Sequence, residues 1–283
     1  MYEESRSQSA YATPQGIRLL QALTAQELYI FTTEDARACA EQCGITVTSI
    51  PYVLHQLMTA GWVQHLRRGL FAGTGSLPNE QRLHPFAVAT RLIEPSAISH
   101  WSALQHHGLT EQLPHYISVT TSRKVVTPGM RQSLSAQAPG DKHRWTVGEL
   151  EIEFITVHAD HFFGIEQVWV DQLFRVPITD RERTLLDLCN SPRRFGGMTE
   201  VLGIFEEHWA SCDLARLIAY ALQYGKGVVA KRLGWVLESV GVPQTAFAPL
   251  LEMPETSYGL LDPSRPHAGP YEPRWRLRNN LRA

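Results

Sequence analysis

The chain has 283 residues, of which 43% are apolar and 19% are charged, and its formal net charge is -2. Its length is about twice that of a typical domain, and its near-neutral charge excludes a protein that binds nucleic acid through overall positive charge. No apolar run reaches the roughly 18 residues that span a bilayer, and the N-terminus lacks a signal-peptide core, so we expect a soluble cytoplasmic protein.

A first helix is expected close to the N-terminus. Thr13 suits the N-cap, and Pro14 suits the first turn, where its missing N–H costs no hydrogen bond. Ile17, Leu20 and Leu23 recur at the spacing of one helical face. We therefore predict that these three side chains are buried together.

Two further helices are expected before residue 60. Thr33 suits the N-cap of the second helix, and Gly44 suits its C-terminal end. Proline is tolerated in the first turn of a helix but not in its interior, so Pro51 favours a third helix that has Thr48 as its N-cap. Gly44 then lies in the turn between the second and third helices.

A hairpin is expected after the third helix. Residues 62–66 and 70–72 form two short extended stretches that are joined by Arg67, Arg68 and Gly69. Two helices, a glycine-containing turn, a third helix and a hairpin are the element order of a winged helix-turn-helix domain. In such domains the third helix enters the major groove of DNA, and the wing approaches the backbone or the minor groove.

The third helix and the hairpin tip supply the predicted DNA contacts. The inward face of the helix is apolar and comprises Ile50, Val53, Leu54 and Leu57. The predicted DNA-binding residues are Thr48, Ser49, Tyr52, His55, Gln56, Arg67 and Arg68. A polar outer face is also what any amphipathic helix has, and the first 75 residues contain five arginines against six acidic residues. Some winged helices make only protein contacts, and that reading stays open.

The remaining residues predict a larger mixed α/β body, so the expected fold class is α+β, with a winged helix-turn-helix at 1–75 and a body at 80–283. The segment between Gly73 and Glu80 has the composition of a linker. Within the body we expect mixed strands and helices at 80–190, mainly helices at 195–245, and an extended basic tail at 260–283. Predicted strands lie at 116–121, 150–157, 168–170, 174–178 and 275–281.

The start of one body helix can be predicted in more detail. Thr179 and Glu182 have the spacing of a capping box that opens a helix at 180–189. Arg183 and Asp187 are four residues apart in this helix, which places them for an ion pair.

No enzyme signature emerges from the body, and no metal or cofactor is expected. His100 and His107 lie two helical turns apart, but no cysteine or acidic cluster with zinc-ligand spacing accompanies them. Glu149, Glu151 and Glu153 alternate along one strand face without a following lysine, which is typical of a solvated strand rather than a nuclease site. The chain has no P-loop, no dinucleotide-binding glycine motif and no nucleophile elbow.

Basic side chains form local clusters in the body, and each is a candidate for contact with phosphate or RNA. The residues in this predicted surface are Arg123, Lys124, Arg131, Arg193, Arg194, Lys231 and Arg232.

Several stretches of the body resemble the AbiEi family of antitoxins and related transcriptional regulators. They are AISHWSALQHHGL (97–109), YISVTTSR (116–123), VPITDRERTLLDLCNSPRRFGG (176–197) and LLDPSRPHAGPYEPRWRLRNNL (260–281). The resemblance covers nearly the whole chain, and its specificity rests on the order and spacing of these segments.

The resemblance implies a type IV toxin-antitoxin system. In that arrangement the N-terminal domain binds inverted repeats in the promoter and represses its own operon. The body counteracts a nucleotidyltransferase-like toxin without a stable complex, and its basic surface is then the candidate for toxin antagonism. The alternative is a winged-helix regulator whose body binds a ligand or a protein and which has no toxin partner.

Overall fold

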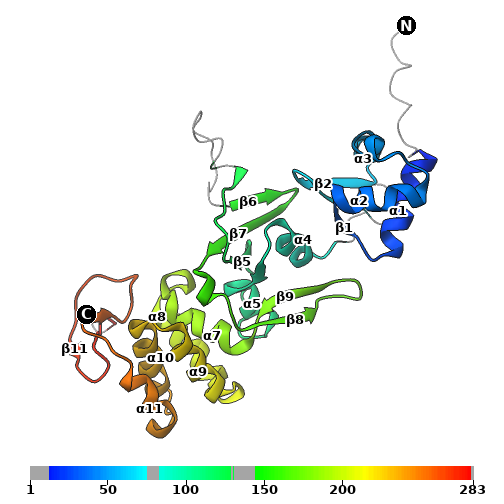
Figure 1. The fold of residues 1–283 in the computed structure, drawn as a ribbon. Coiled ribbons are helices and arrows are strands. Elements are labelled where there is room, and N and C mark those ends of the chain that lie inside the picture. Colours follow the sequence, from blue (N-terminus) through cyan, green and yellow to red (C-terminus); the bar gives the residue numbers. More distant parts are fainter. Residues whose placement is uncertain (1–12, 75–82, 129, 131–143, 282–283) are drawn as a thin grey trace. The chain divides into compact units, whose positions relative to one another are not determined.

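The computed structural model describes residues 13–74, 83–128, 130 and 144–281. The fold is α+β, as expected: helices with a small three-stranded sheet, a central six-stranded sheet, and a helical C-terminal region (Figure 1). The chain divides into two compact units, of which the first comprises residues 1–94 and 169–176, and the second comprises residues 95–168 and 177–283. Most of the predicted linker between Gly73 and Glu80 lies outside the described residues.

The first unit contains the three predicted helices and the predicted hairpin in the expected order, together with a strand that was not predicted and a helix that was assigned to the body. Its helices and strands are α1 (Pro14–Ala25), β1 (Ile30–Thr32), α2 (Thr33–Ala40), α3 (Ile50–Thr59), β2 (Val63–Arg67), β3 (Leu70–Gly73) and α4 (Pro85–Leu92). The strands form an antiparallel sheet in the order β1-β3-β2, so the hairpin gains a third strand that was not predicted. Pairing with β1 fixes the hairpin to the segment that precedes α2.

Two helix starts in this unit differ from the sequence-based predictions. Thr32, not Thr33, caps α2, because Thr32 and Asp35 form reciprocal hydrogen bonds between side chain and backbone N–H. Residues Val47–Ser49 form a 3-10 turn, so α3 starts at Ile50 rather than directly after Thr48. Pro51 lies in the first turn of α3, where the absence of an N–H leaves no helical bond broken.

The buried face of α1 is rotated relative to the prediction. Leu23 is buried as expected, but the residues that accompany it in the core are Gly16 and Leu19. A Cβ atom at Gly16 would lie 2.9 Å from Cδ2 of Leu57, so the absence of a side chain there lets α1 pack closely on α3. Ile17 and Leu20, which were predicted to be buried, are half-exposed.

The second unit is built on a mixed six-stranded sheet. Its strands are β4 (Ser96–Ile98), β5 (Ile117–Thr121), β6 (Arg144–Val147), β7 (Leu150–Thr156), β8 (Ile165–Trp169) and β9 (Arg175–Thr179), in the order β6-β7-β5-β4-β9-β8. Strands β5 and β7 are parallel, and so are β4 and β9, whereas β4 and β5 are antiparallel. The tip of the β8–β9 hairpin, residues 169–176, belongs to the first unit.

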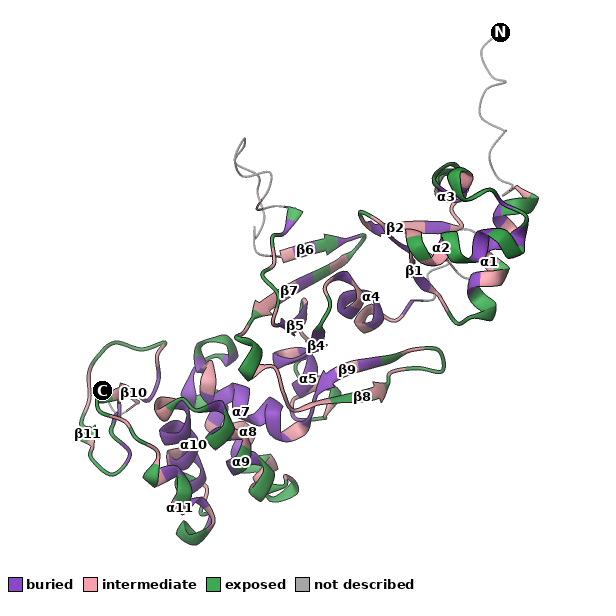
Figure 2. Ribbon diagram, in the orientation of Figure 1, coloured by how far each residue is buried: buried purple, intermediate pink, exposed green. Residues whose placement is uncertain are grey.

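Helices fill the rest of the second unit. They are α5 (His100–His106), α7 (Arg181–Asn190), α8 (Met198–His208), α9 (Leu214–Tyr224), α10 (Gly227–Ser239) and α11 (Gln244–Glu252). Helix α5 packs against β5 and α7, and α7 in turn contacts α9 and α10. Helices α7 and α10 are both largely buried in this region, as the burial colours in Figure 2 show.

The C-terminal segment was predicted to be an extended basic tail with a strand at 275–281; the structure has a short strand within that range, and the whole segment forms a compact layer on the helices. Strands β10 (Gly259–Leu260), β11 (Tyr271–Glu272) and β12 (Leu277–Arg278) make a separate small sheet in the order β10-β12-β11. The indole ring of Trp275 packs over Gly234 of α10, where no Cβ atom would fit, and 1% of Trp275 is exposed. The segment therefore completes the core of the second unit.

The start of α7 combines a confirmed prediction with a wrong one. Arg183 and Asp187 form the predicted ion pair, with each side chain 1% exposed. Asp180 caps the helix by accepting a hydrogen bond from the N–H of Arg183 at 2.7 Å, so the predicted capping box from Thr179 and Glu182 is wrong. The Glu182 carboxylate instead accepts from the N–H of Asp213.

Within the described parts of the chain, no helix has the length and apolar character required to cross a membrane. The four cysteines are free thiols, and Cys212 alone among them is half-buried rather than buried.

Candidate nucleic-acid interface

Helix α3 separates an apolar face from a polar face. Its inward residues are the predicted set, Ile50, Val53, Leu54 and Leu57, and each is at most 2% exposed. On the opposite face, Tyr52 is 64% exposed, His55 is exposed and Gln56 is half-buried. Because the apolar face is used by the core of the first unit, the polar face is the one that remains for a partner.

Tyr52 and Gln56 lie one helical turn apart and form a hydrogen bond. Nε2 of Gln56 donates to the hydroxyl oxygen of Tyr52 over 2.6 Å. This bond orients the amide and leaves its carbonyl oxygen and second N–H available. An amide that presents one acceptor and one donor side by side is the group that pairs with the major-groove edge of adenine.

The 3-10 turn ahead of α3 carries the other predicted helix residues. Thr48 is exposed, Ser49 is half-buried, and the Ser49 hydroxyl makes no capping bond with the helix. Val47 in the same turn is 41% exposed, which sequence periodicity did not indicate because Val47 precedes the helical pattern. An exposed apolar side chain at this position is suited to contact with a thymine methyl group.

The β2–β3 hairpin, the wing of the predicted domain, carries two guanidinium groups at its turn. Arg68 is exposed and Arg67 is half-buried, and Nη1 of Arg67 donates to the carbonyl oxygen of Arg68 at 3.3 Å. The backbone oxygen of Gly69 accepts from the N–H of Thr33, which ties the wing turn to the start of α2. Gly69 itself has φ +73°, a conformation that favours glycine. The arginines are therefore held on an anchored turn rather than on a free loop.

The predicted basic surface of the body is partly present. Arg123 and Lys124 are exposed, Arg193 donates to the carbonyl oxygen of Pro263, and Arg194 forms an ion pair with Glu153 at 2.8 Å. Arg131 lies outside the described residues.

Lys231 and Arg232 do not belong to this surface, and their assignment to it was wrong. They are 3% and 7% exposed, because α10 is enclosed by neighbouring helices and the C-terminal segment. Nζ of Lys231 donates to the carbonyl oxygens of Leu250 and Leu251 at 3.1 and 2.7 Å, near the C-terminal end of α11. Burial lowers the pKa of Lys231 and of Arg232. Both side chains satisfy buried carbonyl groups that helix ends and strands leave free.

Arg232 shows the same arrangement as Lys231. Its Nε and Nη2 donate to the carbonyl oxygen of Leu260, and its Nη1 donates to that of Cys189. The guanidinium group therefore connects the end of α7 to strand β10.

The histidines and acidic residues that were considered for catalysis make hydrogen bonds and ion pairs within the fold. His100 is 3% exposed, with Nδ1 2.9 Å from the Ser99 hydroxyl, and Nε2 of His107 lies 2.7 Å from the carbonyl oxygen of Thr179. The Glu151 and Glu153 carboxylates form ion pairs with Arg144 and Arg194. Across the described ranges, no three histidine, cysteine, aspartate or glutamate side chains are grouped so as to hold a metal ion.

Comparison with known proteins identifies a structure with the same fold but no sequence family. No protein-family model matches this sequence, and no curated protein sequence matches it. The structure is similar to the crystal structure of the Rv2827c protein from Mycobacterium tuberculosis, with a TM-score of 0.63, 16% sequence identity, and coverage of 95% of this chain and 92% of that chain. The likeness shows that the two chains share a fold along nearly their whole length.

Proposed function

We propose that this chain is a DNA-binding transcriptional repressor that autoregulates its operon and also acts as an antitoxin against a nucleotidyltransferase-like toxin. Its partners on this proposal are promoter DNA with inverted repeats and the toxin, which it counteracts without a stable complex. No catalytic role, metal or cofactor is part of the proposal.

The observation that supports DNA binding is the polar face of α3. Tyr52 and Gln56 are hydrogen-bonded to each other on this face, and the opposite face of the helix is buried in the core. Arg67 and Arg68 on the anchored wing turn add two cations within the same compact unit. A recognition helix with an oriented amide, together with a cationic wing, is the set of groups that reads bases and contacts phosphates.

The antitoxin part of the proposal rests on the resemblance to the AbiEi family. The exposed residues Arg123 and Lys124 follow directly on β5, and Arg194 lies in the 3-10 turn after α7, so two of the family-like stretches carry basic groups. These groups are the proposed surface for toxin antagonism.

Two experiments with the full-length chain test this function. A reporter gene under the promoter of the operon should be repressed by the protein and released by Arg67→Ala/Arg68→Ala. Co-expression with the toxin should restore growth, and that same double variant should still protect. Repression and protection that are lost together in a folded double variant would contradict the proposed division of the two activities between the wing and the body.

The second candidate is a regulator that binds a ligand or a protein and has no toxin partner. The observation that favours a ligand is an apolar cavity, which lies in the first unit and not in the body where a ligand site was expected. A downstream gene for a nucleotidyltransferase-like protein would favour the antitoxin, and its absence would favour this second candidate.

A further inference from the structure

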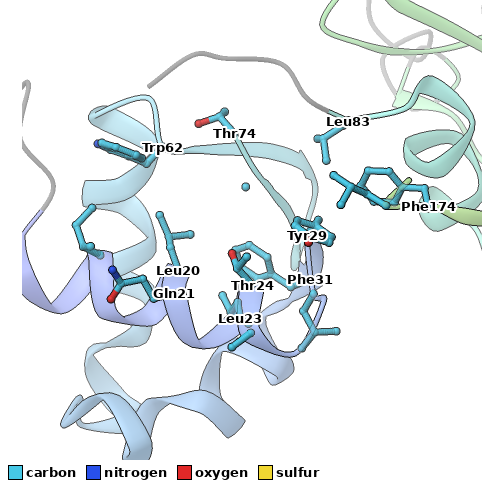
Figure 3. Close-up of a pocket in the computed structure, with 15 residues that line it drawn as sticks. Leu20, Gln21, Leu23, Thr24, Tyr29, Phe31, Trp62, Thr74, Leu83 and Phe174 are labelled. Carbon is cyan, nitrogen blue, oxygen red and sulfur yellow. The ribbon is translucent and has the colours of Figure 1, made fainter. Parts of the chain in front are cut away.

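The first unit contains a cavity of about 800 Å³ that the predicted DNA contacts do not use. The 15 described residues that line it belong to this one compact unit (Figure 3). They come from α1, from β1 and the two residues before it, from the residue before β2, from the end of β3 and the residue after it, from the residue that precedes α4 by two positions, and from the tip of the β8–β9 hairpin. A volume of this size is within the range of small-molecule sites, about 300–1,000 Å³.

One wall of the cavity is the half-exposed face of α1. The apolar spacing of Ile17 and Leu20 predicts burial, but the core of the unit is reached by Gly16, Leu19 and Leu23 instead. Ile17 and Leu20 line the cavity together with Leu23, and Leu20 also packs against the core. The apolar side chains of Ile17 and Leu20 are therefore only partly covered by the described chain.

Aromatic rings from several segments line the cavity (Figure 3). Tyr29, Phe31, Trp62 and Phe174 line the cavity, and the rings of Tyr29 and Phe174 meet edge to face with centroids 5.6 Å apart. Aromatic rings prefer edge-to-face and offset contacts with further rings, so this lining favours a flat aromatic guest.

The polar groups of the lining are uncharged. Gln21 and Thr24 project from the exposed side of α1, and Thr74 donates its hydroxyl to the carbonyl oxygen of Gly61. Among the described residues that line the cavity there is no acidic, basic or histidine side chain. A charged guest would lose its hydration here without gaining a counter-charge, whereas a neutral guest would not.

We propose that this cavity is a binding site for a small, neutral, aromatic molecule. The rings of the guest lie between Leu20 of α1 and the rings of Tyr29 and Phe174, and any polar substituent points to Gln21 and Thr24, the exposed polar residues of the lining. The proposal goes beyond DNA binding and does not depend on it, because the site is defined by a different set of residues.

A matched pair of fluorescent probes tests the site in the full-length protein. Phenylnaphthylamine is neutral and aromatic and becomes more fluorescent in apolar surroundings, and anilinonaphthalene sulfonate is the same molecule with an added sulfonate. We expect saturable binding of phenylnaphthylamine at one site, and binding of the sulfonate that is weaker by about tenfold or more, a difference measurable by titration.

Two variants locate the binding. Thr24→Trp fills the mouth of the cavity from an exposed helix position and should weaken phenylnaphthylamine binding by about tenfold or more. Gln15→Trp adds the same ring at an exposed position of α1 outside the cavity and should leave the affinity unchanged. Thr24→Arg introduces a charge at the mouth and serves as a second blocking variant, with circular dichroism to check that each variant is folded.

The proposal is overturned by any of three results: no saturable phenylnaphthylamine binding, equal affinity for the two probes, or unchanged affinity in both folded Thr24 variants. Because probe fluorescence is the readout, these results are independent of whether the chain binds DNA.

Discussion

Arg183 directs Nε and Nη2 at a single oxygen of Asp187, over 3.2 and 3.0 Å, and the other oxygen of that carboxylate is buried without a partner among the described residues. Nη1 of Arg183 donates to the carbonyl oxygens of His161 and Phe163. The guanidinium group thus joins α7 to the segment that leads into β8. Because the Arg183 side chain also binds two backbone carbonyl groups, removing only one partner of this buried ion pair should destabilise the fold.

Asp187→Ala should therefore lower the free energy of unfolding by about 3–5 kcal/mol, because it leaves the guanidinium charge buried without a counter-charge. Chemical denaturation monitored by circular dichroism measures this change. Glu151→Ala removes one partner of a more exposed ion pair and should cost at most about 1 kcal/mol.

The double variant Arg183→Met/Asp187→Leu separates the charge from the packing. Removing both charges takes away the desolvation cost along with the attraction, so the double variant should be more stable than Asp187→Ala. If the two were equally unstable, packing rather than charge would hold this part of the unit together.

Gln56→Ala should weaken binding to operator DNA by about 1–3 kcal/mol and leave binding to random DNA nearly unchanged, because an amide discriminates through base edges. Fluorescence anisotropy on both duplexes measures the two affinities. Gln42→Ala, an exposed glutamine in the turn after α2, is the matched control and should alter neither.

Tyr52→Phe examines the orientation of the Gln56 amide. It keeps the aromatic ring and removes the hydroxyl that accepts from Nε2 of Gln56. This variant should show part of the fall in operator affinity that is expected for Gln56→Ala. An unaltered operator affinity would mean that the hydrogen bond between the two residues does not position the amide.

Arg67→Ala/Arg68→Ala should weaken binding to all DNA alike and reduce the slope of log affinity against log salt concentration by about 2, since each phosphate contact contributes about 0.9. A salt titration on operator and random duplexes gives both slopes. An unchanged slope would show that the wing does not contact phosphate.

Stability should fall with decreasing pH because of His100. Burial lowers the pKa of His100 below its ordinary value of 6.5, so below that pH the unfolded state binds a proton more readily than the folded state. The free energy of unfolding is then fully retained above pH 6.5 and declines as the pH falls towards the lowered pKa of the folded state.

His100→Asn removes this titration and suits the backbone, since residue 100 has φ +52° and asparagine tolerates that region. Denaturation curves between neutral and mildly acidic pH should show a shallower pH dependence for the variant than for the wild type. Equal slopes would mean that other groups cause the acid sensitivity.

Local patterns predicted the features of the fold that depend on residues close in sequence. The buried face of α3 follows from the spacing of Ile50, Val53, Leu54 and Leu57, and the Arg183–Asp187 pair follows from an i, i+4 spacing. In both cases the residues lie on one helix, so their spacing along the sequence is enough to predict how they are arranged.

Features that depend on distant segments were not predictable in this way. Lys231 is buried because α11 brings two free carbonyl groups to it, and α11 itself was not anticipated. The buried face of α1 was misassigned because the close packing of Gly16 on Leu57 of α3, which brings Leu19 rather than Ile17 and Leu20 into the core, depends on a distant helix. Asp180 caps α7 in place of the expected capping box, and the Glu182 carboxylate accepts a hydrogen bond from the distant N–H of Asp213 instead.

The packing of Trp275 over Gly234 bears on how the chain is synthesised. Nε1 of Trp275 also donates a hydrogen bond to the Glu238 carboxylate, and the ring contacts Phe247. The side chain that packs against both α10 and α11 is therefore encoded after both helices. A nascent chain that has emerged only to residue 260 has all the helices of this region but not the side chain that closes their core. The core of the second unit is therefore complete only after its final strands have been synthesised.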